Sequence, residues 1–71
     1  GTLQINYSCS EKNSLQLTVT NAIGQTVYIE TQQSFSGEYR KEIDMSKHSG
    51  GIYSREIIFG TERRTRKIIL D

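Results

Sequence analysis

Apolar and polar residues alternate along the first third of the chain. Residues 3–9 carry an apolar side chain at every second position, and residues 15–20 repeat this pattern. Alternation with a period of two is typical of a β-strand that buries one face. Both segments are therefore predicted to be strands, joined by a polar turn at residues 10–13. Cys9 shares the apolar positions, so we favour a small buried side chain over a reactive or metal-binding thiol.

A turn and a returning strand are predicted next. Asn21 can accept hydrogen bonds from the backbone that follows it, and Gly24 can adopt the left-handed conformation that such a turn requires. Residues 25–30 then form a strand in which Val27 and Ile29 share one face.

Tyr28 lies on the other face of that predicted strand. Residues 31–34 are polar without periodic apolar positions and are predicted to form a loop. Residues 35–43 again alternate, although Gly37 weakens the pattern and indicates a bulge.

The chain closes with a predicted hairpin. Residues 51–59 and 63–70 are rich in residues that suit strands, and Gly60 between them can adopt the positive φ of a tight turn. Residues 44–51 are interpreted as a connection between sheets. His48 in this connection has no second imidazole or cysteine pair at ligand spacing, so we interpret it as a surface residue rather than a metal ligand.

These segments predict an all-β fold of about six to seven short strands, without a convincing helix. Regular turn signals favour an antiparallel β-sandwich over a barrel. The shared parity of the apolar positions predicts a core of Leu3, Ile5, Leu15, Leu17, Val19, Val27, Ile29, Tyr53, Ile57 and Phe59.

Length and composition limit that core. The chain has 71 residues, of which 34% are hydrophobic, so we expect one domain (residues 1–71) with a thin core. A single cysteine excludes an internal disulfide. We expect a module excised from a larger secreted protein. The sequence has no apolar run near the ~20 residues that span a bilayer and no pattern of a secretory signal at its start.

The residues that catalysis requires do not come together in the sequence. One His, one Cys and no glycine-rich phosphate loop leave no base, nucleophile or metal site to assemble, so we expect neither an enzyme nor a cofactor. Residues 1–54 carry four basic and five acidic residues, whereas residues 55–71 carry five basic and three acidic residues. The basic run at residues 63–67 fits an anion-binding patch or a solvated strand edge, and we favour the edge. It contains no aromatic residue to stack bases, which argues against nucleic-acid binding.

Several motifs in a fixed order resemble a known family. The order runs from the turn with Asn21 and Gly24, through Asp44-Met45-Ser46 and Gly51-Ile52-Tyr53, to the basic strand Thr65-Arg66-Lys67-Ile68-Ile69-Leu70. This order and spacing resemble the C-terminal sorting domain of cargo proteins of the type IX secretion system.

The resemblance implies an immunoglobulin-like β-sandwich that acts as a secretion signal at the end of a cargo protein of Bacteroidetes-type bacteria. It implies secretion or cell-surface attachment by way of the periplasm and outer membrane. The implied partners are the export and sortase-like components of the machinery and the parent cargo domain, with no nucleic acid and no stable membrane insertion. The implied recognition surface lies in the last two strands, with Gly51, Tyr53, Thr65, Arg66, Lys67 and Ile68 as candidate residues.

Two positions depart from the family pattern. His48 and Ser49 stand where the family usually has Leu-Pro, and Arg55 stands where it prefers an aliphatic residue. Arg55 shares the parity of the apolar residues around it, so it either extends its charged end to an edge or marks a bulge. Tyr53 fits equally well a tyrosine corner, in which its hydroxyl bonds the backbone upstream, and a plain core aromatic.

The sequence also fits a second function. A β-sandwich accessory module of an extracellular enzyme would bind carbohydrate or pack on a catalytic domain, with Tyr28 and Tyr39 as an exposed aromatic platform. A structural spacer that recognises no partner is a third interpretation.

Overall fold

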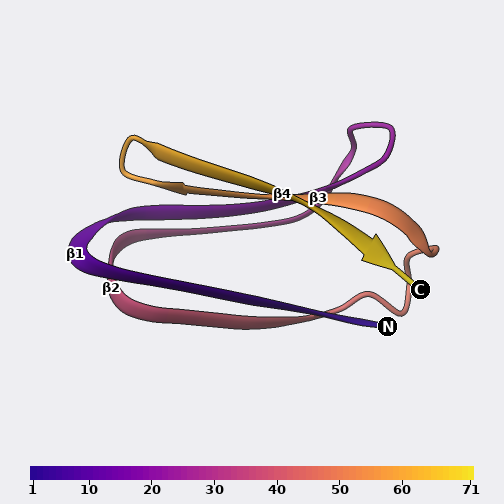
Figure 1. Ribbon diagram of the computed structural model, residues 1–71, viewed down its shortest axis with the longest axis horizontal. Helices are drawn as coiled ribbons and strands as arrows, with labels where there is room; N and C mark the ends of the chain where they lie inside the picture. Colours follow the sequence, from indigo (N-terminus) through magenta and orange to yellow (C-terminus); the bar gives the residue numbers. More distant parts are fainter.

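The computed structural model describes residues 1–71 as four β-strands without a helix (Figure 1). The strands are β1 (Thr2–Asn21), β2 (Thr26–Asp44), β3 (Gly51–Phe59) and β4 (Glu62–Leu70). They form one antiparallel sheet in the order β2-β1-β3-β4. The prediction of an all-β antiparallel fold is confirmed, whereas the prediction of six to seven strands is wrong.

Two predicted strand pairs are in fact two long strands. Residues 10–13 and 31–34, predicted as a turn and a loop, continue the extended backbone of β1 and β2. The pairing of β1 with β2 passes through this region with register shifts between Cys9 and Asn13 and between Asn13 and Leu15. The polar side chains there are mostly exposed because no core lies against them, while pairing with the opposite strand keeps the chain extended.

The long strands bend at these register shifts, so that the sheet folds back on itself (Figure 1). The first half of β1 and the second half of β2 form one layer, and their other halves join β3 and β4 in the second layer. Gly37, with a φ of 95°, lies at the bend opposite Cys9, where the sequence predicted a bulge. One folded sheet takes the place of two separate sheets, so the prediction of an immunoglobulin-like sandwich is not confirmed.

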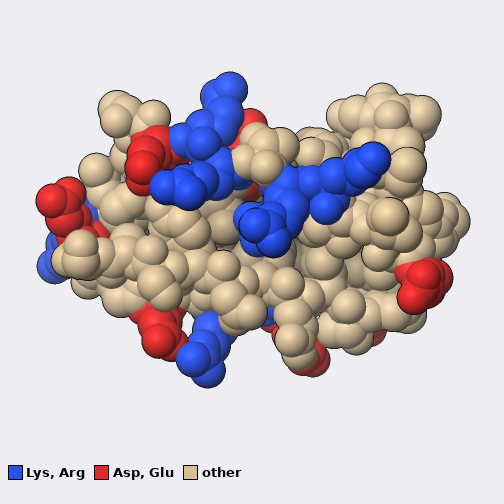
Figure 2. Space-filling model, in the orientation of Figure 1, with Lys and Arg blue, Asp and Glu red and all other residues tan.

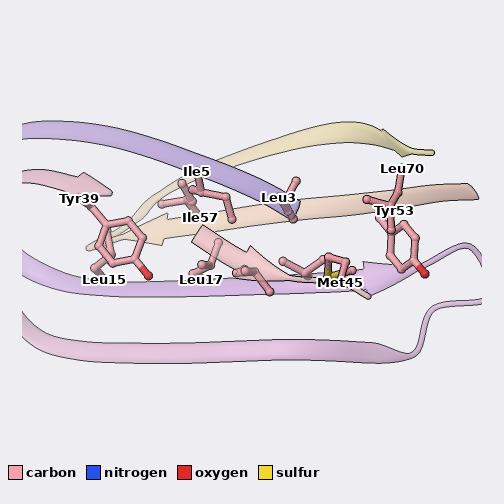
Figure 3. Close-up of a cluster of buried hydrophobic side chains, with 11 residues drawn as sticks. Leu3, Ile5, Leu15, Leu17, Tyr39, Met45, Tyr53, Ile57 and Leu70 are labelled. Carbon is pink, nitrogen blue, oxygen red and sulfur yellow. The ribbon is translucent and has the colours of Figure 1, made fainter. Parts of the chain in front are cut away.

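The core lies between the two layers (Figure 3). Alternate residues of β1 face it, because successive side chains of a strand point to opposite faces. The core contains 11 buried residues, and it is as thin as the composition predicted. The buried residues are Leu3, Ile5, Leu15, Leu17, Val19, Tyr39, Ile43, Met45, Tyr53, Ile57 and Leu70.

The prediction that Ile29 faces the core is wrong, because Ile29, in the first half of β2, is 57% exposed. Val19, which is buried, pairs with Tyr28, whereas Ile29 pairs with Thr18 on the outer face. A register shift follows between Val19 and Thr20. Because the side-chain period of a strand is two, this pairing puts Tyr28 rather than Ile29 on the side of the core.

The core also contains side chains that the apolar pattern missed. Met45, just beyond β2, is 1% exposed, and its N–H donates a 2.9 Å hydrogen bond to the carbonyl oxygen of Gly1. Leu70 closes the core from the end of β4. Val27 and Phe59, predicted as core, are only partly buried at its margin.

The remaining single residues lie near the surface. His48 is exposed in the connection between β2 and β3, as predicted. Cys9 is only half-buried, so the prediction of a buried side chain holds in part, and its Sγ lies 3.8 Å from the carbonyl oxygen of Gly37. The structure contains no helix of the length and apolarity that crossing a membrane requires.

Candidate recognition surface on the last hairpin

The last two strands form a regular hairpin. Their pairing runs without a register shift from Gly51 opposite Leu70 to Phe59 opposite Glu62. Gly60 makes the turn with a φ of 61°, and its N–H donates a 2.9 Å hydrogen bond to the carbonyl oxygen of Ser14 on β1. The hairpin is therefore fixed to the centre of the sheet at its turn as well as along β3.

β4 forms one edge of the sheet. It pairs with β3 alone, so half of its backbone N–H and C=O groups point away from the sheet. Figure 2 shows a band of basic side chains over this strand. The strand contains four basic residues and one acidic residue.

The two faces of β4 carry different side chains. Ile68, opposite Tyr53, packs against the core margin, and Arg66, opposite Arg55, lies on the same face. Thr65 and Lys67 lie on the outer face and are exposed. The sheet edge therefore presents basic groups on both faces.

Ion pairs neutralise only one end of the basic band. Arg63 Nε lies 3.3 Å from a carboxylate oxygen of Glu56, and Arg64 pairs with Glu62 at 3.5 Å. Lys67 has no ion pair, and neither has Arg66. The uncompensated positive charge thus lies toward the C-terminal end of β4.

Arg55 extends this uncompensated charge onto β3. The pairing of β3 is continuous on both sides, so the alternative of a bulge at Arg55 is excluded. Its side chain is half-buried on the face of Tyr53 and Ile57, and its Nε is buried without a hydrogen-bond partner. Burial lowers the pKa of the Arg55 guanidinium, and the neighbouring charge of Arg66 lowers that pKa further.

Tyr53 holds the start of the hairpin in place. Its side chain is 5% exposed, and its hydroxyl donates a 2.6 Å hydrogen bond to the carbonyl oxygen of Ser49. This is the geometry of a tyrosine corner. Gly51, between the two, has a φ of 144°, a value that L side chains rarely adopt. The ring of Tyr53 therefore exposes little surface in the folded domain.

The turn of Asn21 and Gly24 lies beside this corner. The Oδ1 of Asn21 accepts hydrogen bonds from the N–H groups of Ile23 at 3.2 Å and Gln25 at 2.8 Å, and Gly24 has a φ of 87°. Asn21 pairs with Tyr53 across β1 and β3. A shallow pocket of about 240 Å³ lies between this turn and residues 49–53.

The candidate residues thus divide by exposure. Thr65, Arg66 and Lys67 are exposed along β4, and Gly51 is exposed at the start of β3. Tyr53 is buried, and Ile68, the sixth candidate, is partly buried against the core. The exposed group can contact a partner directly. The two covered side chains support the shape of the hairpin.

A polar cluster around Glu30 lies at the opposite edge of the sheet. The Glu30 carboxylate accepts hydrogen bonds from the hydroxyls of Tyr28 at 2.8 Å and Tyr39 at 3.1 Å, and from Gln32 Nε2 at 3.2 Å. Lys41 Nζ lies 3.0 Å from the same carboxylate. Glu30 belongs to the first half of β2, and Tyr39 and Lys41 to the second half, so the cluster connects the two layers.

Electrostatics stabilise the charged form of Glu30. The hydroxyl of Tyr28 is the main cause that lowers the Glu30 pKa to about 2, helped by Gln32, Lys41 and Tyr39 and opposed by burial. The hydrogen bond to Glu30 raises the pKa of Lys41. Sequence reasoning missed this cluster because its members are brought together by the bend of β2. The alternation of Tyr28, Glu30 and Gln32 on one face was the only signal.

The free edge of β4 offers a surface for binding. No group of three or more His, Cys, Asp or Glu residues is close enough to hold a metal ion. The free edge of β4 can pair with another strand, and its basic side chains can attract an anion.

The chain was compared with protein families, curated proteins and solved structures. A family model described as a secretion system C-terminal sorting domain matches residues 1–71. Comparisons with curated proteins and with solved structures gave no match.

Proposed function

We propose that this chain acts as a signal for export by type IX secretion. The chain belongs to the family of secretion system C-terminal sorting domains. The family is one of non-catalytic sorting signals for secretion. The proposal adds the route: the domain directs a cargo protein across the outer membrane through the type IX machinery. The observation that carries it is the family match, which extends over residues 1–71.

The hairpin of β3 and β4 is the proposed recognition surface. Its edge is free, and Thr65, Arg66 and Lys67 are exposed there. Export machinery that reads a folded signal needs accessible groups on a rigid scaffold, and a strand edge provides both. Gly51, Tyr53 and Ile68 are assigned a supporting role, because they fix the path and packing of the two strands.

The chain is proposed to act as one domain, residues 1–71, carried by a larger cargo protein. Its partners are then that cargo domain and the export and sortase-like components at the outer membrane. The cargo would be released from the cell or attached to its surface.

The alternative of an accessory module was suggested by an exposed aromatic platform of Tyr28 and Tyr39, which the structure does not contain. Tyr39 is 4% exposed, and Tyr28 is partly buried with its hydroxyl bonded to Glu30. A carbohydrate platform requires exposed aromatic faces, so these two side chains do not form one.

A reporter fusion tests the proposed route. A periplasmic fluorescent protein followed by residues 1–71 is produced in a bacterium with an active type IX system and in a matched strain whose system is inactive. Protease accessibility on intact cells and release into the medium are measured. We expect export in the first strain and periplasmic retention in the second. Retention in both strains, with the fusion folded and intact, would refute the proposal.

A further inference from the structure

Arg55 occupies a position that would otherwise hold an apolar side chain. It lies between Tyr53 and Ile57 on the inner face of β3, and it pairs with Val19 of β1 and Arg66 of β4. Its Nε is buried without a hydrogen-bond partner. A buried donor that lacks a partner is costly, so a group that accepts a hydrogen bond from this Nε would be favoured here.

Arg55 and Arg66 lie side by side on one face of the hairpin without an acidic partner. Arg55 and Arg66 are directly opposite each other in the register of β3 and β4, and neither forms an ion pair. Like charges at paired positions of a sheet repel each other. A carboxylate between them would remove the repulsion and accept hydrogen bonds from both, because guanidinium groups bind carboxylates through paired donors.

The neighbouring acidic residues do not supply that carboxylate. Glu56 pairs with Arg63, and Glu62 pairs with Arg64, both nearer the hairpin turn. Arg55 and Arg66 therefore lack an acidic partner, whereas Arg63 and Arg64 each have one. This difference indicates a specific site at Arg55 and Arg66 and not a uniformly basic surface.

The free edge of β4 indicates how a carboxylate would arrive. An extended peptide that pairs with an edge strand places every second side chain on the inner face of the sheet, next to Arg66. The other free edge, β2, is less suited to an acidic strand. Its basic residues Arg40 and Lys41 already pair with Glu38 and Glu30.

We propose that β4 accepts an acidic, extended segment of a partner protein as a fifth strand, with a carboxylate of that segment bound between Arg55 and Arg66. The geometry of the hairpin alone supports the binding of an acidic strand. The further statement that this strand belongs to the export machinery rests on the proposed function. A phosphate group could also contact two arginines, but it would leave the backbone of β4 unpaired, so the free edge favours the peptide.

Nuclear magnetic resonance of the 15N-labelled 71-residue chain tests the binding without secretion. The probe is a nine-residue peptide in which glutamate alternates with threonine. One control peptide replaces each glutamate with glutamine, and another keeps glutamate but is N-methylated at alternate backbone positions. We expect the glutamate peptide to shift the Arg55 Nε–H signal and to slow amide exchange in β4 at least about tenfold. We expect both controls to bind at least about tenfold more weakly, since one lacks the charge and the other cannot pair with a strand.

Matched arginine variants test the site. Arg66→Gln should weaken binding of the glutamate peptide about tenfold, whereas Arg64→Gln, which removes a side chain already paired with Glu62, should change it less than about threefold. Both positions are exposed, so the fold is expected to persist, and the amide spectrum of each variant checks it. Equal losses in the two variants would overturn the specific site.

Two other results would overturn the proposal. One is no shift of the Arg55 signal at millimolar glutamate peptide. The other is a shift produced equally by inorganic phosphate or anionic vesicles, with no protection of β4 amides by the peptide. Because the reporter fusion measures export separately, export without peptide binding would reject this inference and leave the proposed function in place.

Discussion

The hydroxyl of Tyr53 donates a 2.6 Å hydrogen bond to the carbonyl oxygen of Ser49, four residues upstream, while its ring is buried in the core. The bond fixes the connection from β2 at the point where it enters β3. Removal of the hydroxyl leaves the Ser49 carbonyl oxygen with one hydrogen-bond partner fewer. We expect Tyr53→Phe to lower the free energy of unfolding by about 0.5–1.5 kcal/mol in urea titrations.

Tyr7 provides the matched control for this prediction. Its ring is partly buried against Phe59, with the ring centroids 5.9 Å apart, and its hydroxyl forms no hydrogen bond within the protein. Tyr7→Phe should therefore change the free energy of unfolding by no more than about 0.5 kcal/mol. Equal effects of the two substitutions would mean that the Tyr53 hydrogen bond contributes no stability.

The turn glycines Gly24 and Gly60 should differ in their tolerance of alanine. Both have positive φ, at 87° and 61°, so alanine is strained at either position by about 1 kcal/mol or more. A Cβ at Gly24 would meet open space, whereas a Cβ at Gly60 would collide with the side chain of Asn13. That side chain is held by a 2.8 Å hydrogen bond from the N–H of Ser14.

We therefore expect Gly60→Ala to cost about 1 kcal/mol more than Gly24→Ala in the free energy of unfolding. This difference in cost should shrink when Asn13→Gly is added to both variants, because the collision is then removed. Thermal or urea unfolding of Gly24→Ala and Gly60→Ala, each with and without Asn13→Gly, measures the coupling. An unchanged excess in the Asn13→Gly background would contradict the steric explanation.

Glu30 should make the domain sensitive to acid. Its pKa is lowered from 4.5 to about 2 in the folded protein, chiefly by the hydroxyl of Tyr28. A lowered pKa means that the folded state favours the carboxylate, so the stabilisation is present above pH 4.5 and is lost as the pH falls toward 2. Its side chain is 25% exposed, so solvent screening limits the contribution to about 1–2 kcal/mol.

Glu30→Gln should abolish this part of the stability loss between pH 4.5 and pH 2 and lower stability at neutral pH. Glu38→Gln is the control, since Glu38 pairs with Arg40 on the surface and such pairs contribute little. Urea titrations at several pH values compare the three proteins. A parallel acid response of wild type and Glu30→Gln would show that the cluster does not depend on the charge of Glu30.

The sequence predicted the local features of this fold better than its long-range ones. The alternation in residues 3–9 and 15–20 identified the buried side of β1, and the turn chemistry of Asn21 and Gly24 identified its end. These features depend on neighbouring residues and are therefore readable from the sequence. The polar residues 10–13 resemble a turn locally, but pairing with β2 keeps them extended.

Register explains the errors on β2. The side of Ile29 depends on whether it pairs with Thr18 or Val19, a one-residue difference that the strand's own pattern does not encode. The same limit applies to the candidate site. The sequence identified the basic run and noted Arg55 as unusual, but the pairing of Arg55 with Arg66 is set by the hairpin register.

The last prediction concerns the exposed side chains of β4 in export. Thr65 and Lys67 lie on the outer face of the free edge and take part in no ion pair or side-chain hydrogen bond. The combined substitution of Thr65→Ala and Lys67→Ala should change the free energy of unfolding by only about 0.5 kcal/mol per position. If the export machinery contacts this edge, the reporter fusion with both substitutions should accumulate in the periplasm although its domain is folded.

A matched pair on the opposite edge strand separates recognition from a general loss of polar surface. Thr26 and Arg40 of β2 are likewise an exposed threonine and an exposed basic residue. Thr26→Ala with Arg40→Ala should leave export unchanged, while urea titration shows similar stability for the two double variants. Deleting β4 would not make this distinction, because the loss of Leu70 opens the core and the domain would unfold whether or not β4 is recognised. Equal export of both double variants and the unsubstituted fusion would show that the machinery does not contact Thr65 and Lys67. A loss of export confined to the β4 variant would place the recognition surface at that edge.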